Sequence, residues 1–257
     1  MPYEILLHSV IAGLLASFAC GLGALPLLIK RLDLRKHTGL GYGFAGGLML
    51  AASVYNLILP GLTLAQQEMS LAQVLPVLLG LLAGSAFLWV TDIYLSEERL
   101  SQASWRRWGG RAEILIFLAM SVHSIPEGVA VGVGFASQEV YANNLGAYIA
   151  LAIAIHNIPE GLAVAIPLRA AGASITKCFW AAFLTSLPQP IAAVPAAMAS
   201  WFFQPLMPVL MGFAAGAMMF LILLELIPQA LNVEKPTRIA WAFMLGFGLM
   251  LLIQVVL

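Results

Sequence analysis

Long, almost uninterrupted apolar stretches are the feature that most limits the folds open to this sequence. A helix crosses about 30 Å of hydrocarbon with about 20 mostly apolar residues, because it rises about 1.5 Å per residue. About eight such stretches follow one another along the 257 residues. Lipid leaves no partner for open backbone groups, and these stretches are too long and too uniformly apolar for the alternating strands of a barrel. Each stretch is therefore predicted to be a helix.

The predicted fold class is an all-α membrane protein, with one polytopic transmembrane domain over residues 1–257. The eight predicted spans are residues 5–29, 38–62, 70–94, 112–136, 142–169, 174–201, 205–230 and 237–257. Only 9% of the residues are charged, against roughly 25% in soluble domains. The first stretch lacks a preceding basic segment, so we expect it to be a retained span rather than a signal peptide.

The charges divide by side of the predicted bundle. All 12 basic residues fall in the connections after spans one, three, five and seven: Lys30, Arg31, Arg35, Lys36, Arg99, Arg106, Arg107, Arg111, Arg169, Lys177, Lys235 and Arg238. The other connections hold Glu68 and Glu139 and no basic residue. The positive-inside rule then predicts extracytoplasmic termini in the cell (inner) membrane. A formal net charge of zero gives no basic surface for nucleic acid.

Two internal repeats organise the chain. Residues 123–128 read His-Ser-Ile-Pro-Glu-Gly and residues 156–161 read His-Asn-Ile-Pro-Glu-Gly, in consecutive spans of opposite direction. A fainter repeat links residues 43–49 in span two with residues 212–218 in span seven. Such inverted repeats are typical of secondary transporters, so we predict that spans 1–3 and 6–8 are related around the central pair 4–5. The fainter repeat has a second interpretation, as small residues that let helices pack closely.

The repeated motif carries metal-binding chemistry. Residues four apart share one face of a helix, so His123 lies beside Glu127 and His156 beside Glu160. Ionised carboxylates near the bilayer centre cost several kcal/mol unless a cation or partner balances them. Two imidazole nitrogens and two carboxylate oxygens suit Zn²⁺, with other first-row ions close behind. The four residues are therefore predicted to form a mid-membrane metal site.

Ser124 and Asn157 follow the two histidines on a neighbouring helix face. Two interpretations remain open for them, as accessory oxygen ligands or as interhelical hydrogen-bonding residues. Asn56 and Glu225 occupy matching places relative to the fainter repeat. They either line the ion pathway or serve interhelical bonding.

On these residues the chain resembles the ZIP (Zrt/Irt-like) family of divalent metal transporters, and most of all its compact bacterial type. The resemblance rests on the two His-x-Ile-Pro-Glu-Gly motifs, on residues 43–45, on residues 212–216 and on Glu225-Leu226-Ile227-Pro228. The resemblance implies uptake of Zn²⁺, Fe²⁺, Mn²⁺ or Cd²⁺ toward the cytosol, and it implies that the protein is a homodimer. It also implies an elevator-like motion, in which spans one, four, five and six move against a frame of spans two, three, seven and eight.

Two positions depart from the family pattern. Ser124 stands where the family usually has Asn, and Gln189 stands where it usually has Glu. Both changes bear on a second, adjacent metal position. A neutral amide does not offset the repulsion between two dications roughly 4 Å apart. We therefore predict about one tightly bound metal ion per chain.

Two other classes of function compete with a carrier. A membrane-embedded metalloenzyme would call for Glu-x-x-His or His-Glu-x-x-His spacing, which the sequence lacks. A metal-selective channel could use the same four ligands. Channels need weak or multiple sites so that ions leave quickly. Four strong ligands in one place favour a carrier.

Overall fold

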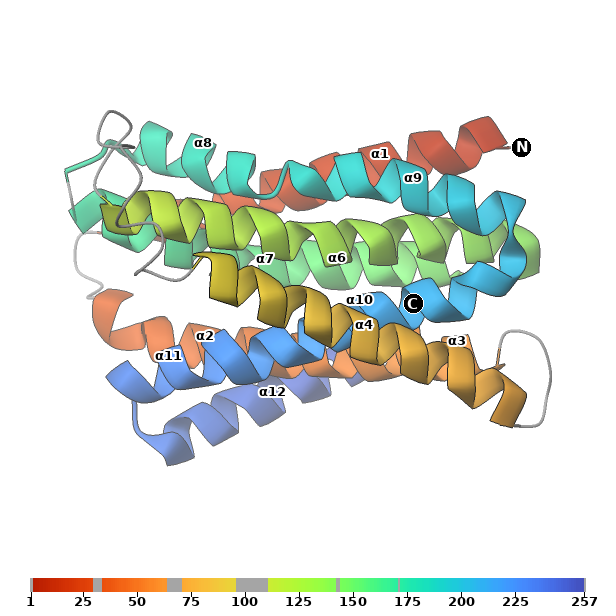
Figure 1. Cartoon of the computed structure of the whole chain (residues 1–257). Coiled ribbons are helices and arrows are strands. Elements are labelled where there is room, and N and C mark those ends of the chain that lie inside the picture. The colour runs from red at the N-terminus through yellow and green to blue at the C-terminus, as the bar shows by residue number, and fades with distance from the viewer. Residues whose placement is uncertain are drawn as a thin grey trace.

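The computed structural model describes residues 2–29, 34–63, 71–95, 111–141, 144–170 and 172–256. Within these residues the chain forms eight long helical segments and no strand (Figure 1). The segments are α1 (Pro2–Leu22) with η1 (Leu25–Leu28); α2 (Leu34–Ala52), η2 (Ser53–Ile58) and α3 (Leu59–Thr63); α4 (Leu71–Leu95); α6 (Arg111–Tyr141); α7 (Leu145–Ala170); α8 (Ile175–Thr185) and α9 (Pro188–Phe202); η3 (Gln204–Leu206), α10 (Met207–Leu221), η4 (Ile222–Leu226) and α11 (Ile227–Val233); and α12 (Pro236–Val256).

The described segments have the length and apolarity of membrane spans. Seven of them are long and apolar enough to cross a bilayer, and α6, with 31 residues, is the eighth long segment. The predicted all-α membrane class is confirmed. That residues 1–257 act as one domain stays a prediction.

Large apolar side chains cover the outward faces of α4 and α12. The exposed residues include Leu75, Leu79, Leu82, Trp89, Trp241, Leu245 and Leu252. Burial of such side chains in a non-aqueous medium is worth about 1.5–3 kcal/mol each. These two helices therefore need lipid or a protein partner as their surroundings.

Spans two and seven share an unusual backbone feature. The π-helical turn η2 begins at Ser53, ten residues after Gly43, and η4 begins at Ile222, ten residues after Gly212. Single π turns inside α-helices are rare and occur often at functional sites. The fainter sequence repeat thus extends to the backbone, and it places Asn56 and Glu225 in equivalent turns.

Glycines of the fainter repeat bring equivalent helix pairs together. A Cβ added to Gly47 would collide with the carbonyl oxygen of Phe243 in α12, and one added to Gly216 would collide with that of Leu81 in α4. Helices can approach this closely only where a side chain is missing. In the inverted repeat α2 corresponds to α10 and α12 corresponds to α4. The α2–α12 pair is therefore equivalent to the α10–α4 pair. Both interpretations of these residues hold, since they are a true repeat and they also serve close packing.

The glycines of the two His-x-Ile-Pro-Glu-Gly motifs also allow close contacts between equivalent helix pairs. A Cβ on Gly128 would strike the carbonyl oxygen of Gln189 in α9, and one on Gly161 would strike that of Cys20 in α1. The α6–α9 and α7–α1 pairs are therefore related by the inversion. Gln189 and Cys20 occupy equivalent positions in the two halves of the repeat.

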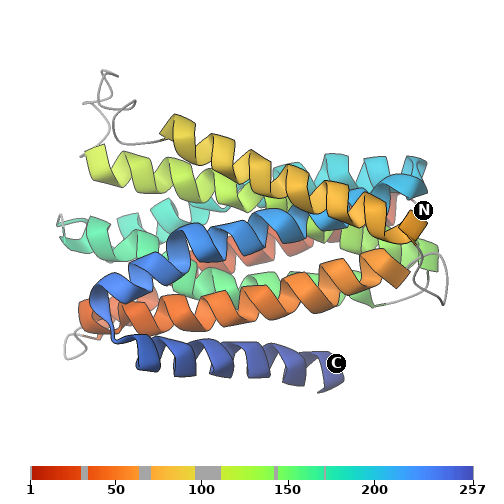
Figure 2. The same ribbon diagram turned by 60° about the horizontal axis from the view of Figure 1, so that its bottom comes forward.

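The helices form two groups. Helices α1, α6, α7, α8 and α9 pack on one another, and α2, α4, α10, α11 and α12 pack on one another, with α6–α10 and α2–α7 as the main contacts between the groups. Both chain ends lie at one end of the bundle (Figures 1 and 2). The connections from α7 to α8 and from α11 to α12 lie at the other end (Figure 1).

Candidate metal centre

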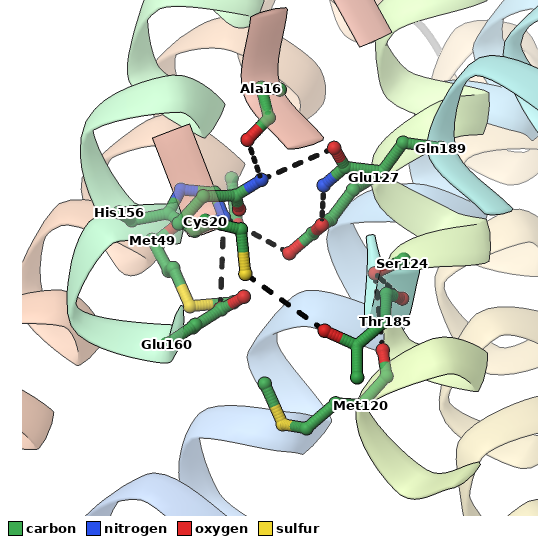
Figure 3. A network of polar contacts seen from close by, with 12 residues as sticks. Ala16, Cys20, Met49, Met120, Ser124, Glu127, His156, Glu160, Thr185 and Gln189 are labelled. Atoms are coloured by element: carbon green, nitrogen blue, oxygen red, sulfur yellow. Dashed lines mark hydrogen bonds and ion pairs between the residues drawn. The ribbon is translucent and has the colours of Figure 1, made fainter. Parts of the chain in front are cut away.

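Three side chains of the repeated motif meet in the middle of α6 and α7. One ligand atom from each of Glu127, His156 and Glu160 lies within 4.8 Å of the others. His156 Nε2 is 3.0 Å from Glu127 Oε1 and 3.8 Å from Glu160 Oε1. All three side chains are buried, and Figure 3 shows them converging. The structure thus brings together three of the four residues predicted as metal ligands.

The local sequence explains why these groups are available. The four-residue spacing of His156 and Glu160 stacks them on one face of α7. Pro126 lies inside α6 and cannot donate a hydrogen bond to the carbonyl of Val122, one turn earlier. This freed carbonyl lies beside His123 in the sequence, where it adds an oxygen acceptor near the metal-binding motif.

The cluster leaves polar atoms without partners. Neither Glu160 Oε1 nor His156 Nδ1 has a hydrogen-bond partner in the described part of the chain. The basic groups paired with Glu127 and Glu160 among the described residues are imidazoles rather than Lys or Arg. A buried carboxylate without a counter-charge is costly. The set of one imidazole and two carboxylates fits a divalent cation such as Zn²⁺, which binds nitrogen and carboxylate oxygen ligands.

His123 lies apart from these three residues. Its Nε2 is 3.6 Å from Glu225 Oε1 in η4, and it does not belong to the group whose ligand atoms lie within 4.8 Å. His123 is still close along the chain, one helical turn before Glu127. The structure thus joins a predicted primary ligand with a predicted pathway residue, and the role of His123 as a ligand stays a prediction.

An amide network surrounds Glu127. Gln189 Nε2 donates to Glu127 Oε2, and Asn157 Nδ2 donates to Gln189 Oε1 at 3.2 Å. Asn157 Nδ2 also donates to the carbonyl of Ala16 in α1 at 3.0 Å. Figure 3 shows Gln189 next to Glu127, at the centre of these contacts. Helices α1, α6, α7 and α9 are therefore joined at the metal centre.

Ser124 and Asn157 both make interhelical hydrogen bonds. Ser124 Oγ lies 3.0 Å from the carbonyl oxygen of Thr185 in α8 and 3.1 Å from that of Met120 in its own helix. The Asn157 bond to Ala16 is the equivalent contact across the repeat. The bonding interpretation of these two residues is thus met in the structure, although Asn157 Oδ1 has no partner among the described residues.

Asn56 and Cys20 are two further buried residues. Asn56 is fully buried, and neither polar atom of its amide has a partner in the described ranges. The sulfur of Cys20 lies 4.0 Å from Thr185 Oγ1, a contact that Figure 3 draws. Cys20 is not among the site residues predicted from the sequence. Its equivalence with Gln189 in the inverted repeat is the signal that would have found it.

A bundle of span-length apolar helices that buries two carboxylates around one imidazole has the features of a membrane protein that handles divalent metal ions. The ZIP Zinc transporter family model matches residues 96–254. The chain belongs to the ZIP zinc transporter family.

Individual relatives agree with this assignment. The zinc transporter GufA of Myxococcus xanthus is 35% identical over 248 residues, which cover 93% of this chain and 96% of GufA. The zinc transporter ZIPB of Bordetella bronchiseptica is 34% identical over 254 residues, 97% of this chain and 81% of ZIPB. Human zinc transporter ZIP11 is 42% identical over 156 residues, 60% of this chain and 44% of ZIP11.

Family membership confirms the coarse function predicted from the sequence. The chain is a multi-pass membrane protein that transports divalent metal ions, with zinc as substrate. Because ZIP proteins are transporters, the prediction that the chain is not an enzyme is confirmed as well.

Proposed function

We propose that this chain is a carrier that moves Zn²⁺ toward the cytosol through a mid-membrane site of Glu127, His156, Glu160 and His123. One observation carries the proposal, the buried cluster in which Glu160 Oε1 has no hydrogen-bond partner among the described residues. A dication would neutralise the two carboxylates there. The same cation would have to leave again, so the ligands must be exchanged during transport.

The placement of His123 and Glu225 supports a second station, that is, a second position at which the ion binds on its way across the protein. In α6, His123 lies one turn N-terminal to Glu127, a distance of about 6 Å along the helix axis. In α7, Glu160 lies one turn C-terminal to His156. Because α6 and α7 run in opposite directions, both steps lead toward the same end of the bundle, where the basic connections lie. Zn²⁺ would pass from Glu127 and His156 through Glu160 to the His123–Glu225 pair.

The two helix groups support alternating access of the elevator type. Glu127, His156 and Glu160 all belong to the group of α1 and α6 to α9, whereas Glu225 belongs to the other group. A movement of the first group would carry the three ligands as a unit past the second. The alternative is a metal-selective channel with the same residues. Counterflow separates them, since external zinc accelerates efflux of labelled internal zinc only in a carrier.

The site assignment is tested by replacing Glu160. Removing one carboxylate about 4 Å from a dication costs up to about 8 kcal/mol at an effective dielectric constant near 20, twice the value for two unit charges. Allowing for compensation by water, we expect Glu160→Ala to weaken zinc binding about a hundredfold. Proteoliposome uptake at limiting zinc measures this. Glu234→Ala, which removes a carboxylate that pairs with Arg238 far from the cluster, is the matched control. A wild-type rate for correctly inserted Glu160→Ala would refute the site.

Ion range, assembly and orientation belong to the same proposal. Imidazole and carboxylate ligands do not discriminate sharply among first-row ions, so Fe²⁺, Mn²⁺ and Cd²⁺ should compete with labelled zinc. The apolar outward faces of α4 and α12 are the surfaces on which a homodimer would form, within the lipid bilayer of the inner membrane. Both termini would be extracytoplasmic, opposite the basic connections.

A further inference from the structure

Gln189 is held rigidly beside the metal centre by its backbone. It lies in the first turn of α9, directly after the break that separates α8 from α9, and its N–H donates to the carbonyl of Ser186 at 3.0 Å. Its own carbonyl lies under Gly128, where any Cβ would collide with it. The side chain is fully buried. Little freedom is left for it except to face Glu127.

The contacts of Gln189 require a primary amide. Its Nε2 donates to Glu127 Oε2, and its Oε1 accepts from Asn157 Nδ2. A carboxylate at this position could not donate to Glu127, and an ammonium group could not accept from Asn157. Of these side chains, an amide alone joins the two neighbours and leaves the charge of the cluster unchanged.

These contacts give the two carboxylate oxygens of Glu127 different partners. Oε1 faces His156 at 3.0 Å, while Oε2 is occupied by the N–H of Gln189. A cation can therefore reach Glu127 through one oxygen, and the side facing α9 is closed to a second cation. Two carboxylates are balanced by one dication. A neutral amide would not reduce the repulsion from another dication roughly 4 Å away.

Glu160 lacks an equivalent restraint. The inverted repeat puts Cys20 where Gln189 stands for Glu127, and a thiol is a weak donor. The sulfur of Cys20 lies 4.0 Å from Thr185 Oγ1, and Glu160 Oε1, 3.8 Å from His156 Nε2, has no hydrogen-bond partner in the described residues. The two glutamates of the repeated motif are therefore not equivalent in this chain.

We propose that Gln189 is a positioning residue that presets Glu127 as a one-oxygen ligand and limits the centre to a single divalent cation. Glu160 is then the ligand that reorients when the ion arrives and departs. The inference rests on the proposed metal site, and it adds what fixes the geometry and the ion count of that site.

The test compares Gln189→Met, Gln189→Glu and the wild type. Met has a similar length and no amide, so Glu127 loses its restraint and KM for zinc should rise about 10- to 100-fold, the usual effect of losing a group that orients a ligand. Glu would supply a carboxylate in place of the N–H, so a second, weaker zinc ion should bind. Wild-type protein should hold about one zinc ion per chain by metal analysis.

Ser200→Ala is the matched control, because Ser200 is a buried residue of the same helix whose Oγ has no partner among the described residues. It should leave KM and the zinc count unchanged. A role in folding alone would lower the melting midpoint of Gln189→Met without moving KM or stoichiometry, and that result would overturn the inference. Two zinc ions in the wild type would overturn it too.

Failure of the site itself is recognised separately. If zinc binding survives Glu160→Ala, the proposed centre is misplaced. If binding depends on Glu160 but Gln189→Met and Gln189→Glu behave as the wild type, the centre stands and the positioning role of Gln189 is wrong.

Discussion

The contact between α1 and α7 offers a direct test of how tightly the metal centre is held. Gly161 follows Glu160 and packs against the backbone of Cys20. Gly23 makes the reciprocal contact, since a Cβ there would collide with the carbonyl of Ile158. The two helices are thus joined by glycines on both sides, and Gly161→Ala places a methyl group where the backbone of α1 already lies.

The size of the effect follows from the distances. An added Cβ would lie 2.6 Å from the carbonyl carbon of Cys20, whereas ordinary contact begins at 3.4 Å. The helices must therefore separate by about 1 Å, and overpacking of this kind costs about 1–3 kcal/mol. The better helix propensity of Ala returns up to about 1 kcal/mol. Metal–ligand distances tolerate deviations of only about 0.2 Å. A shift of Glu160 that follows a helix separation of about 1 Å should therefore also raise KM for zinc.

Thermal unfolding of the detergent-purified protein and zinc uptake measure the two effects. Gly161→Ala should melt below the wild type and transport with a higher KM. Gly248→Ala in α12 is the control, because nothing lies within 4 Å of its added Cβ, and it should melt at or slightly above the wild type. Equal melting and equal KM for Gly161→Ala would refute the reasoning.

Two further predictions concern the exit and the orientation. Glu225→Gln removes the charge that faces His123, so the maximal zinc uptake rate should fall roughly tenfold with a smaller change in KM; initial rates that match the wild type would contradict the second station. In a background without native cysteines, Lys177→Cys at the exposed start of α8 should resist impermeant thiol reagents added from outside, whereas Gln204→Cys in η3, also exposed, should react. The reverse labelling would put the termini in the cytosol.

The sequence by itself determined the class of the protein and indicated which side chains to propose for its metal centre. Apolar length requires helices because lipid cannot satisfy open backbone groups. The four-residue spacing of His156 and Glu160 puts both on one helix face whatever the rest of the chain does. The repetition of that motif in antiparallel spans indicated that the two copies face each other. These inferences depend on local geometry and on the solvent, both of which the sequence carries.

Tertiary structure decided which groups meet. His123 has the same place in its motif as His156, yet it lies 3.6 Å from Glu225 of η4. The counterpart of η4 is η2, which carries Asn56 in the equivalent turn, so the fainter repeat supplies a carboxylate in one half and only an amide in the other. The sequence shows that Gln189 departs from the family pattern in charge, but its hydrogen bond to Glu127 depends on how closely Gly128 lets α9 approach α6. Contacts between spans distant in sequence depend on the relative rotation and depth of whole helices. Neither quantity is encoded in the spacing within one helix.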